Sequence, residues 1–210
     1  MTGRFITLEG GEGTGKSTQI KRLADALQAK GIKVLATREP GGSPGAEQIR
    51  KLMVEGEPGR WDAITETLLV YAARADHVAR TIGPALMAGT WVISDRFNDS
   101  TFAYQGVGRG VPRETIRRID SAVLDDFAPD LTLVLDLDVK LGLERAMARA
   151  SASVENRFEK FGADFHEKLR QAFLDIARRS PDRCRVIDAG GSEDAVAEAI
   201  LTAVCRRFVL

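Results

Sequence analysis

The chain has 210 residues, 44% of them apolar and 29% charged, which are proportions typical of a single globular domain. Thirty basic residues balance thirty acidic ones, so there is no overall positive field to attract nucleic acid or an acidic membrane surface. Two cysteines are too few for a disulfide framework, and no apolar run approaches the roughly 20 residues that span a bilayer. We therefore expect one cytoplasmic domain over residues 1–210, without nucleic-acid or membrane partners, that binds any anionic ligand at a local site.

Five short apolar runs predict buried parallel strands, because helical patterns long enough to serve as crossover connections separate them. The runs are residues 5–8, 34–37, 91–94, 131–137 and 185–187. This alternation predicts an α/β fold with a five-stranded parallel sheet and helices on both faces. In such a sheet, ligands bind beyond the carboxyl ends of the strands.

The predicted helices differ in how clearly the sequence marks them. Apolar residues recur at helical spacing over residues 20–27, and Gly31 ends that helix. A longer helical pattern over residues 65–87 is expected to bend or restart at Gly83-Pro84. Two further helices are predicted, one that begins near Asp164 and one over residues 193–208.

Residues 150–160 form a polar, weakly patterned segment between two predicted helices. Such a segment can be a plain surface loop or a lid that closes over a ligand. The pattern by itself leaves both interpretations open.

A phosphate-binding loop is predicted directly after the first strand. Residues 10–17, GGEGTGKS, match the pattern G-x-x-x-x-G-K-[ST] at every fixed position, and a helical pattern follows. The glycines allow successive backbone N–H groups to point at phosphate oxygens. Lys16 can reach the β- and γ-phosphates, and the Ser17 hydroxyl can bind Mg²⁺. The predicted nucleotide-binding residues are Gly10, Gly11, Glu12, Gly13, Thr14, Gly15, Lys16 and Ser17.

Three classes of protein share this loop: monophosphate kinases, GTPase switches, and ATPase motors or partner-binding modules. A GTPase needs an Asn-Lys-x-Asp element to read guanine, and the sequence contains none. The motor remains an alternative, because segment 131–137 with Asp136 and Asp138 can imitate its strand that ends in carboxylates. The kinase explains more of the remaining sequence.

Five segments resemble the thymidylate kinase family and come in the same order as in that family. They are FITLEG at 5–10, TREPGG at 37–42, YAAR at 71–74, DRF at 95–97 and STFAYQG at 100–106. The resemblance extends over about residues 4–208. It implies a P-loop nucleoside monophosphate kinase fold, ATP and Mg²⁺ as cosubstrate and cofactor, dTMP as the acceptor, dTDP as the product, and a homodimer.

The resemblance also implies roles at the phosphates. Arg96 follows the third predicted strand and would hold the dTMP phosphate, while Asp95 would lie near the metal together with Ser17. Glu12, a carboxylate inside a phosphate loop, would engage the acceptor nucleotide. Lys16, Glu12 and Arg96 form the expected catalytic set, to which the lid residue Arg157 is added below.

Position 13 distinguishes two kinds of family member. Some carry an arginine there that reaches the transferred phosphate, whereas this chain has Gly13. Members without that arginine supply the charge from the lid, so the resemblance implies that Arg157 stabilises the transition state. Arg149 resembles the arginine that stacks on adenine. Segment 150–160 is accordingly expected to be a lid.

Recognition of dTMP is assigned by the same resemblance. Arg74 would bind a carbonyl of the base, and Thr101 and Gln105 would read its polar edge. Glu39, in the TREPGG segment, is also expected to bind dTMP. Tyr104 would lie under the sugar, where its bulk disfavours a ribose 2′-hydroxyl.

One position departs from the family. Where a phenylalanine often stacks on thymine, four residues before Arg74, this chain has Val70. Tyr71 is adjacent but points about 100° away on a helix, so it is no substitute. A dual or shifted preference among nucleoside monophosphates therefore remains an alternative to strict use of dTMP.

Overall fold

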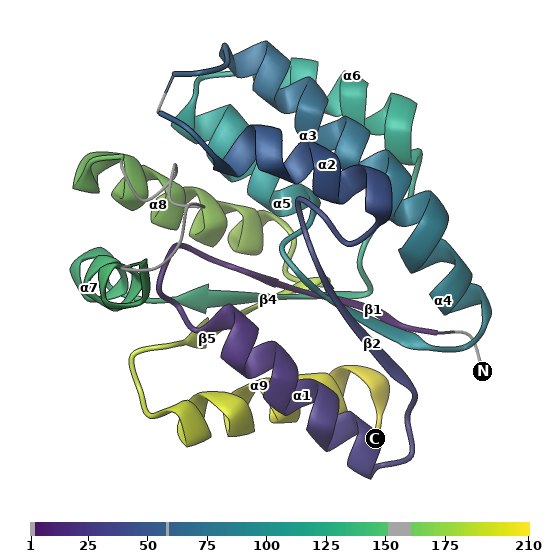
Figure 1. Cartoon of the computed structure of the whole chain (residues 1–210). Helices are drawn as coiled ribbons and strands as arrows, with labels where there is room; N and C mark the ends of the chain where they lie inside the picture. The colour runs from purple at the N-terminus through teal and green to yellow at the C-terminus, as the bar shows by residue number, and fades with distance from the viewer. Residues whose placement is uncertain (1–2, 58, 151–160) are drawn as a thin grey trace.

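A five-stranded, fully parallel sheet forms the centre of the computed structural model, which describes residues 3–57, 59–150 and 161–210 (Figure 1). The strand order is β2-β3-β1-β4-β5. The strands are β1 (Phe5–Glu9), β2 (Val34–Arg38), β3 (Trp91–Asp95), β4 (Leu131–Asp136) and β5 (Cys184–Asp188). This confirms the α/β fold and the five predicted strands. Each strand begins and ends within one residue of its predicted bounds.

The central strands are buried on both faces, which is why they appear in the sequence as unbroken apolar runs. In β1, Ile6 and Leu8 point into the core on one face, while Phe5 packs on the other against Phe97, with 4.9 Å between ring centroids. β5 lies at the edge of the sheet, and only Cys184 and Ile187 of its five residues are buried. That exposure explains why its apolar run is the shortest.

Helices cover both faces of the sheet (Figure 1). Helices α1 and α9 pack together on one face, and α3, α6 and α8 lie on the other. The helices of the described residues are α1 (Lys16–Ala29), α2 (Pro44–Val54), α3 (Ala63–His77), α4 (Gly83–Met87), α5 (Asn98–Thr101), α6 (Arg113–Leu124), α7 (Val139–Ala150), α8 (Ala163–Arg179) and α9 (Glu193–Phe208). Two π-helical segments, η1 (Val78–Ile82) and η2 (Phe102–Gly108), join α3 to α4 and extend α5.

The long helix predicted over residues 65–87 changes its winding earlier than expected. It becomes π-helical at Val78, one turn before Gly83-Pro84, and α-helical winding resumes at Gly83. Pro84 has no N–H and its ring collides with the carbonyl one turn earlier, so a wider turn before it relieves that conflict. The prediction identified the cause but placed the irregularity too late.

Helices α2, α5 and α6 were not singled out from the sequence. α5 is only four residues long, whereas α2 and α6 are amphipathic and were missed. Segment 151–160, which holds most of the expected lid, lies outside the described residues. In the described part of the chain, no helix has the length and apolarity needed to cross a bilayer.

Candidate active site

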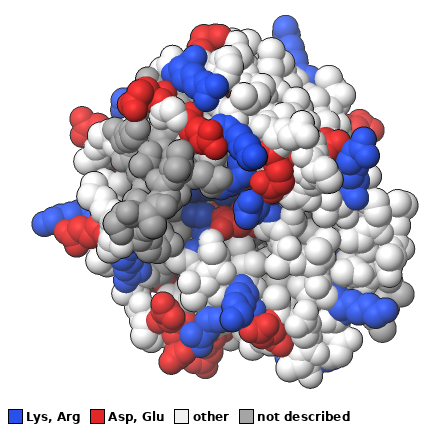
Figure 2. Space-filling view, viewed as in Figure 1, with Lys and Arg blue, Asp and Glu red and all other residues white. Residues whose placement is uncertain are grey.

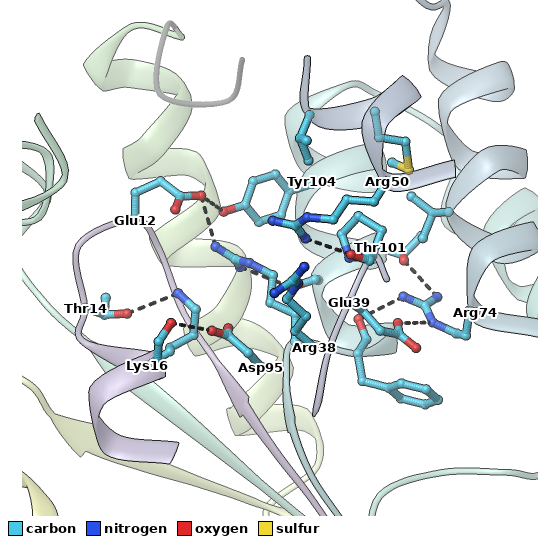
Figure 3. A pocket seen from close by; sticks show the side chains of 18 of the residues that line it. Glu12, Thr14, Lys16, Arg38, Glu39, Arg50, Arg74, Asp95, Thr101 and Tyr104 are labelled. Atoms are coloured by element: carbon cyan, nitrogen blue, oxygen red, sulfur yellow. Dashed lines mark hydrogen bonds and ion pairs between the residues drawn. The ribbon is translucent and has the colours of Figure 1, made fainter. Parts of the chain in front are cut away.

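A cavity of about 360 Å³ opens at the carboxyl ends of β1, β2 and β3, where the strand pattern predicted a ligand. Lys and Arg side chains lie in and beside a hollow on this face of the molecule, together with acidic side chains (Figure 2). Five cationic residues line the cavity against three carboxylates, so it favours an anion although the whole chain is neutral. Figure 3 shows the phosphate loop at one end of this cavity and Arg74 with Glu39 at the other.

The ammonium group of Lys16 lies inside the phosphate loop. It donates to the carbonyls of Gly11 at 2.8 Å and Gly10 at 3.2 Å and to the hydroxyl of Thr14 at 3.3 Å. Burial and the nearby Arg96 guanidinium lower the pKa of Lys16 to about 8. The loop therefore holds a buried cation whose charge an entering phosphate would stabilise.

Gly13 has a structural reason to carry no side chain. Its φ is +71°, and a Cβ atom there would lie 1.9 Å from the carbonyl oxygen of Gly142 in α7. The backbone of α7 thus packs directly on the phosphate loop. An arginine at position 13 does not fit this loop conformation.

Glu12 joins the phosphate loop to Arg96 and Tyr104 (Figure 3). Its Oε1 accepts from Arg96 Nη2 at 3.0 Å and from the Tyr104 hydroxyl at 2.7 Å. Burial opposes the ionised form, but Arg96 and Lys16 outweigh it and lower the pKa of Glu12 to about 2. Glu12 is thus a charged residue that orients a cation and a phenol.

Arg96 is held from several sides at once. Its guanidinium also donates to the Gly10 carbonyl at 2.9 Å and to Ser100 Oγ at 3.2 Å, and it stacks 4.9 Å from the centre of the Tyr104 ring. Its backbone has φ of +70°, a strained conformation for a residue with a side chain. Such strain is found mostly at functional sites, and here it directs Arg96 into the cavity.

Ser17 and Asp95 meet at the edge of the phosphate loop, where the Ser17 hydroxyl donates to Asp95 Oδ2 at 2.9 Å. A hydroxyl and a carboxylate beside a phosphate site suit Mg²⁺, which usually binds one or two protein oxygens together with substrate phosphates and water. These two residues fit the metal that the sequence implied.

Arg74 is fully engaged at the opposite end of the cavity, with only 2% of its surface exposed. Its Nε donates to Glu39 Oε2 at 2.7 Å, and Nη2 donates to the Phe97 carbonyl at 3.0 Å. Nη1 donates to Asn98 at 3.1 Å and to Thr101 Oγ1 at 3.0 Å. The guanidinium is therefore fixed before any ligand arrives.

Glu39 helps to hold the Arg74 guanidinium in place. Its second oxygen lies 3.0 Å from Nδ1 of His77, whose Nε2 lies 2.7 Å from the hydroxyl of Thr37. All of these groups are buried or partly buried, and each has a partner. In this structure Glu39 contacts Arg74 and His77, so it orients the Arg74 guanidinium, and His77 is a buried part of the network.

Val70 and Gln105 line the same end of the cavity, beside Met53 and Val54. Tyr71, the next residue along α3, packs instead in the core under α6 and donates to Asn98 at 2.8 Å. The expected side-chain directions of Val70 and Tyr71 on this helix agree with the structure.

Several lining residues were missed from the sequence. Arg38 ends β2, and Arg50 on α2 donates to the Pro40 carbonyl at 2.7 Å. The chain contains 22 arginines, so residue type alone could not select these two. Arg50 follows the TREPGG segment by about two helical turns, a spacing that could have placed it near the site.

The other predicted residues are Asp136, Arg149 and Arg157. Asp136, which supported the motor alternative, forms an ion pair with Arg170 at 2.7 Å. Arg149 belongs to α7, but its side chain is not described, and Arg157 lies outside the described residues.

A parallel α/β sheet, a phosphate loop after its first strand, and an adjoining arginine-lined cavity define a P-loop kinase with the nucleoside monophosphate kinase fold. Comparison with known proteins identifies the family. The family model described as thymidylate kinase matches residues 8–200, so the chain belongs to the thymidylate kinase family.

Individual relatives agree with this family. The chain is 55% identical to a thymidylate kinase of Caulobacter vibrioides over 208 residues, which cover 99% of each chain. It is 53% identical to one of Jannaschia sp. over 204 residues, 97% of each chain. The crystal structure of thymidylate kinase from Ehrlichia chaffeensis superposes with a TM-score of 0.77 at 33% identity, and the match covers 97% of this chain and 99% of that one.

Proposed function

We propose that this protein transfers the γ-phosphoryl group of ATP to dTMP and produces dTDP, as the thymidylate kinase family does. The observation that carries the proposal is the single cavity that runs from the phosphate loop to Val70, Arg74 and Gln105. A monophosphate bound there would place its phosphate beside Arg96 and its base at the buried end.

Positioning and charge neutralisation are the main requirements of phosphoryl transfer. We assign ATP to residues 10–17, with Lys16 neutralising its phosphates, and the dTMP phosphate to Arg96, which Glu12 orients. Arg38 and Arg50 line the same cavity and add positive charge near the acceptor phosphate. Tyr104, held by Glu12, would pack under the deoxyribose.

Ser17 and Asp95 would hold Mg²⁺. When bound, the ion would supply positive charge that neutralises the phosphates of ATP. We expect the reaction to stop with excess EDTA and to recover on addition of Mg²⁺. The Ser17→Ala variant should need more Mg²⁺ for half-maximal turnover, whereas an unchanged requirement would contradict this assignment.

Two arginines of the lid region complete the proposal. Arg157 would stabilise the transition state, because Gly13 leaves no room for an arginine in the loop, and Arg149 would stack on adenine. Arg157→Ala should lower kcat much more than it raises the KM for dTMP, since a transition-state contact contributes little to substrate binding. If kcat is unchanged, Arg149 becomes the next candidate.

A coupled assay of ADP release tests the function directly. We expect turnover with dTMP to be far above that with UMP, CMP, AMP or GMP. Among the alternative acceptors, dUMP should give the highest rate. Comparable rates with several monophosphates would favour a shifted preference. ATP hydrolysis that needs no acceptor would overturn the proposal.

We also propose a cytoplasmic homodimer. The family resemblance supports the homodimer, and so do exposed apolar side chains on the neighbouring helices α2 and α3, where Leu52, Ile64 and Leu68 are 39%, 41% and 51% exposed. The cytoplasmic location is supported by the two cysteines, which are both free thiols, as in a reducing compartment. Light scattering should give twice the 22.9 kDa chain mass, and Leu68→Lys should shift it toward the monomer. A monomeric wild type would contradict the dimer.

A further inference from the structure

Glu66 on α3 is a buried carboxylate that the sequence did not mark as functional. Its side chain is fully buried, and its Oε1 accepts a hydrogen bond from Gln105 Nε2 at 2.9 Å. Its other oxygen lies 3.7 Å from Arg109 Nη1, and Arg109 in turn donates to the Trp61 carbonyl at 2.8 Å. A buried charge is costly unless it is paired, so this carboxylate is held in place by defined partners.

This contact decides which way the Gln105 amide points. An ionised carboxylate only accepts hydrogen bonds, so the NH₂ group of Gln105 must face Glu66. The carbonyl oxygen Oε1 then occupies the other arm of the amide, and Gln105 lines the cavity. Among the described residues, no group donates a hydrogen bond to Gln105 Oε1. This atom is nevertheless not one of the buried polar atoms that lack a partner, so a ligand can reach it. Gln105 therefore presents an acceptor to a ligand.

The Thr101 hydroxyl can supply a hydrogen-bond donor to the same end of the cavity. Its hydroxyl oxygen accepts from Arg74 Nη1 at 3.0 Å, and a guanidinium only donates. The proton of the Thr101 hydroxyl is left to donate, and no acceptor in the described part of the chain takes it. The buried end of the cavity thus presents one acceptor that Glu66 fixes and one hydroxyl whose proton is available to donate.

These two polarities match one class of pyrimidine. Thymine and uracil carry an N–H at position 3 beside a carbonyl at position 4, which need an acceptor and a donor. Cytosine carries a bare nitrogen and an amino group at these positions, which need the reverse. A site whose buried polar groups are fixed for one pattern rejects the other strongly, because the mismatched groups stay unpaired.

We propose that Glu66 is a positioning residue that determines base specificity: by fixing the Gln105 amide, it makes the cavity select 4-oxo over 4-amino pyrimidine nucleotides. This inference rests on the proposed function, since it concerns the base of the acceptor. Glu66 acts through Gln105 and touches no substrate itself.

The test is the ratio of kcat/KM for dTMP to that for dCMP. In Glu66→Gln, the new amide can donate as well as accept, so Gln105 can turn its NH₂ group toward the ligand. We expect the ratio to fall by about 10- to 100-fold, mainly through a lower KM for dCMP, with kcat for dTMP little changed. The double variant Glu66→Gln/Gln105→Met provides the control, since Glu66→Gln should not lower the ratio further once Gln105 is absent.

Each outcome decides a separate point. An unchanged ratio in a Glu66→Gln protein with the wild-type melting temperature overturns the role of Glu66, as does an equal fall of the ratio in the Gln105→Met background. If Glu66→Gln does not fold, Glu66→Asp, which keeps the charge but draws it back from Gln105, should give a smaller fall in the same ratio, and no fall overturns the proposal. Failure of wild type to phosphorylate dTMP would instead overturn the proposed function.

Discussion

The two ends of the active-site cavity are built in different ways. The base end is the end of the cavity that we propose for the base. There, Arg74, Glu39 and His77 are buried, and Glu39 is hydrogen-bonded to both of the others before any ligand is present. At the phosphate end, Lys16 and Arg38 offer positive charge, and the Arg38 side chain is 54% exposed. The base end is a closed hydrogen-bonded network. The phosphate end is also hydrogen-bonded, through Lys16, Arg96 and Glu12, but it keeps cationic groups such as Arg38 at the surface, where an anion can reach them.

This difference separates specificity from reactivity. Fixed donors and acceptors at the base end reject a ligand with the wrong pattern, because the mismatch would leave buried groups unpaired. A cluster of cations attracts any phosphate and gains its full effect only when charge develops during transfer. Substitutions at the base end should therefore change stability and substrate choice, and those at the phosphate end should change rate.

The largest effect on stability is expected for Arg74→Met. Removal of the guanidinium leaves Glu39 buried beside an apolar chain, which costs roughly 3–5 kcal/mol in the free energy of unfolding. Urea denaturation measures it. Arg80→Met is the matched control, since the ion pair of Arg80 with Asp76 is exposed and contributes about 1 kcal/mol or less. If both variants lost the same unfolding free energy, the buried network at the base end would contribute no more to stability than an exposed ion pair.

Lys16→Ala should have the largest effect on rate. Loss of a charge aimed at the phosphates typically costs about 10²- to 10³-fold in kcat, while the fold should persist. Because burial lowers the pKa of Lys16 to about 8, kcat/KM for ATP in wild type should also fall as pH rises through that value. Lys21→Ala on the exposed side of α1 is the control. Near-normal kcat in folded Lys16→Ala would contradict the phosphate-loop assignment.

Val70→Phe should change affinity more modestly. An aromatic ring at this wall of the cavity would stack on the base and add roughly 0.5–1.5 kcal/mol, about a 2- to 10-fold tighter Kd for dTMP. Val70→Leu adds volume without a ring and should leave Kd nearly unchanged. Calorimetry on variants with unchanged melting temperatures measures both. Weaker binding of dTMP to such a Val70→Phe protein would show that Val70 does not face the base.

The pH dependence of Glu12 provides a further test. Its folded-state pKa of about 2 lies below its ordinary value of 4.5, so its stabilising contribution is complete above 4.5 and is lost as pH falls toward 2. Glu12→Gln does not titrate there. The difference in unfolding free energy between wild type and this variant should therefore shift against wild type between about pH 5 and 3. A constant difference would mean that Glu12 is not ion-paired in the folded protein.

The sequence predicted the sheet well because buried parallel strands leave continuous apolar runs, and it predicted the phosphate loop because every part of that motif is local. It did not reveal Arg50, which lines the cavity from α2, or Glu66, which contacts the lining residue Gln105 from α3. Nor did it reveal that Glu39 contacts Arg74, since that pair is 35 residues apart in the chain. Partners of this kind depend on how the helices pack on the sheet, and no short motif encodes that.

The contrast between the two ends is tested most directly by titrating wild-type protein with dTMP and with thymidine at low and high salt. Thymidine reaches only the base end, so its Kd should be nearly independent of ionic strength. The tighter binding of dTMP should weaken as salt screens the cations at the phosphate end. If thymidine and dTMP respond equally to salt, or bind equally well, the two ends do not divide recognition in this way.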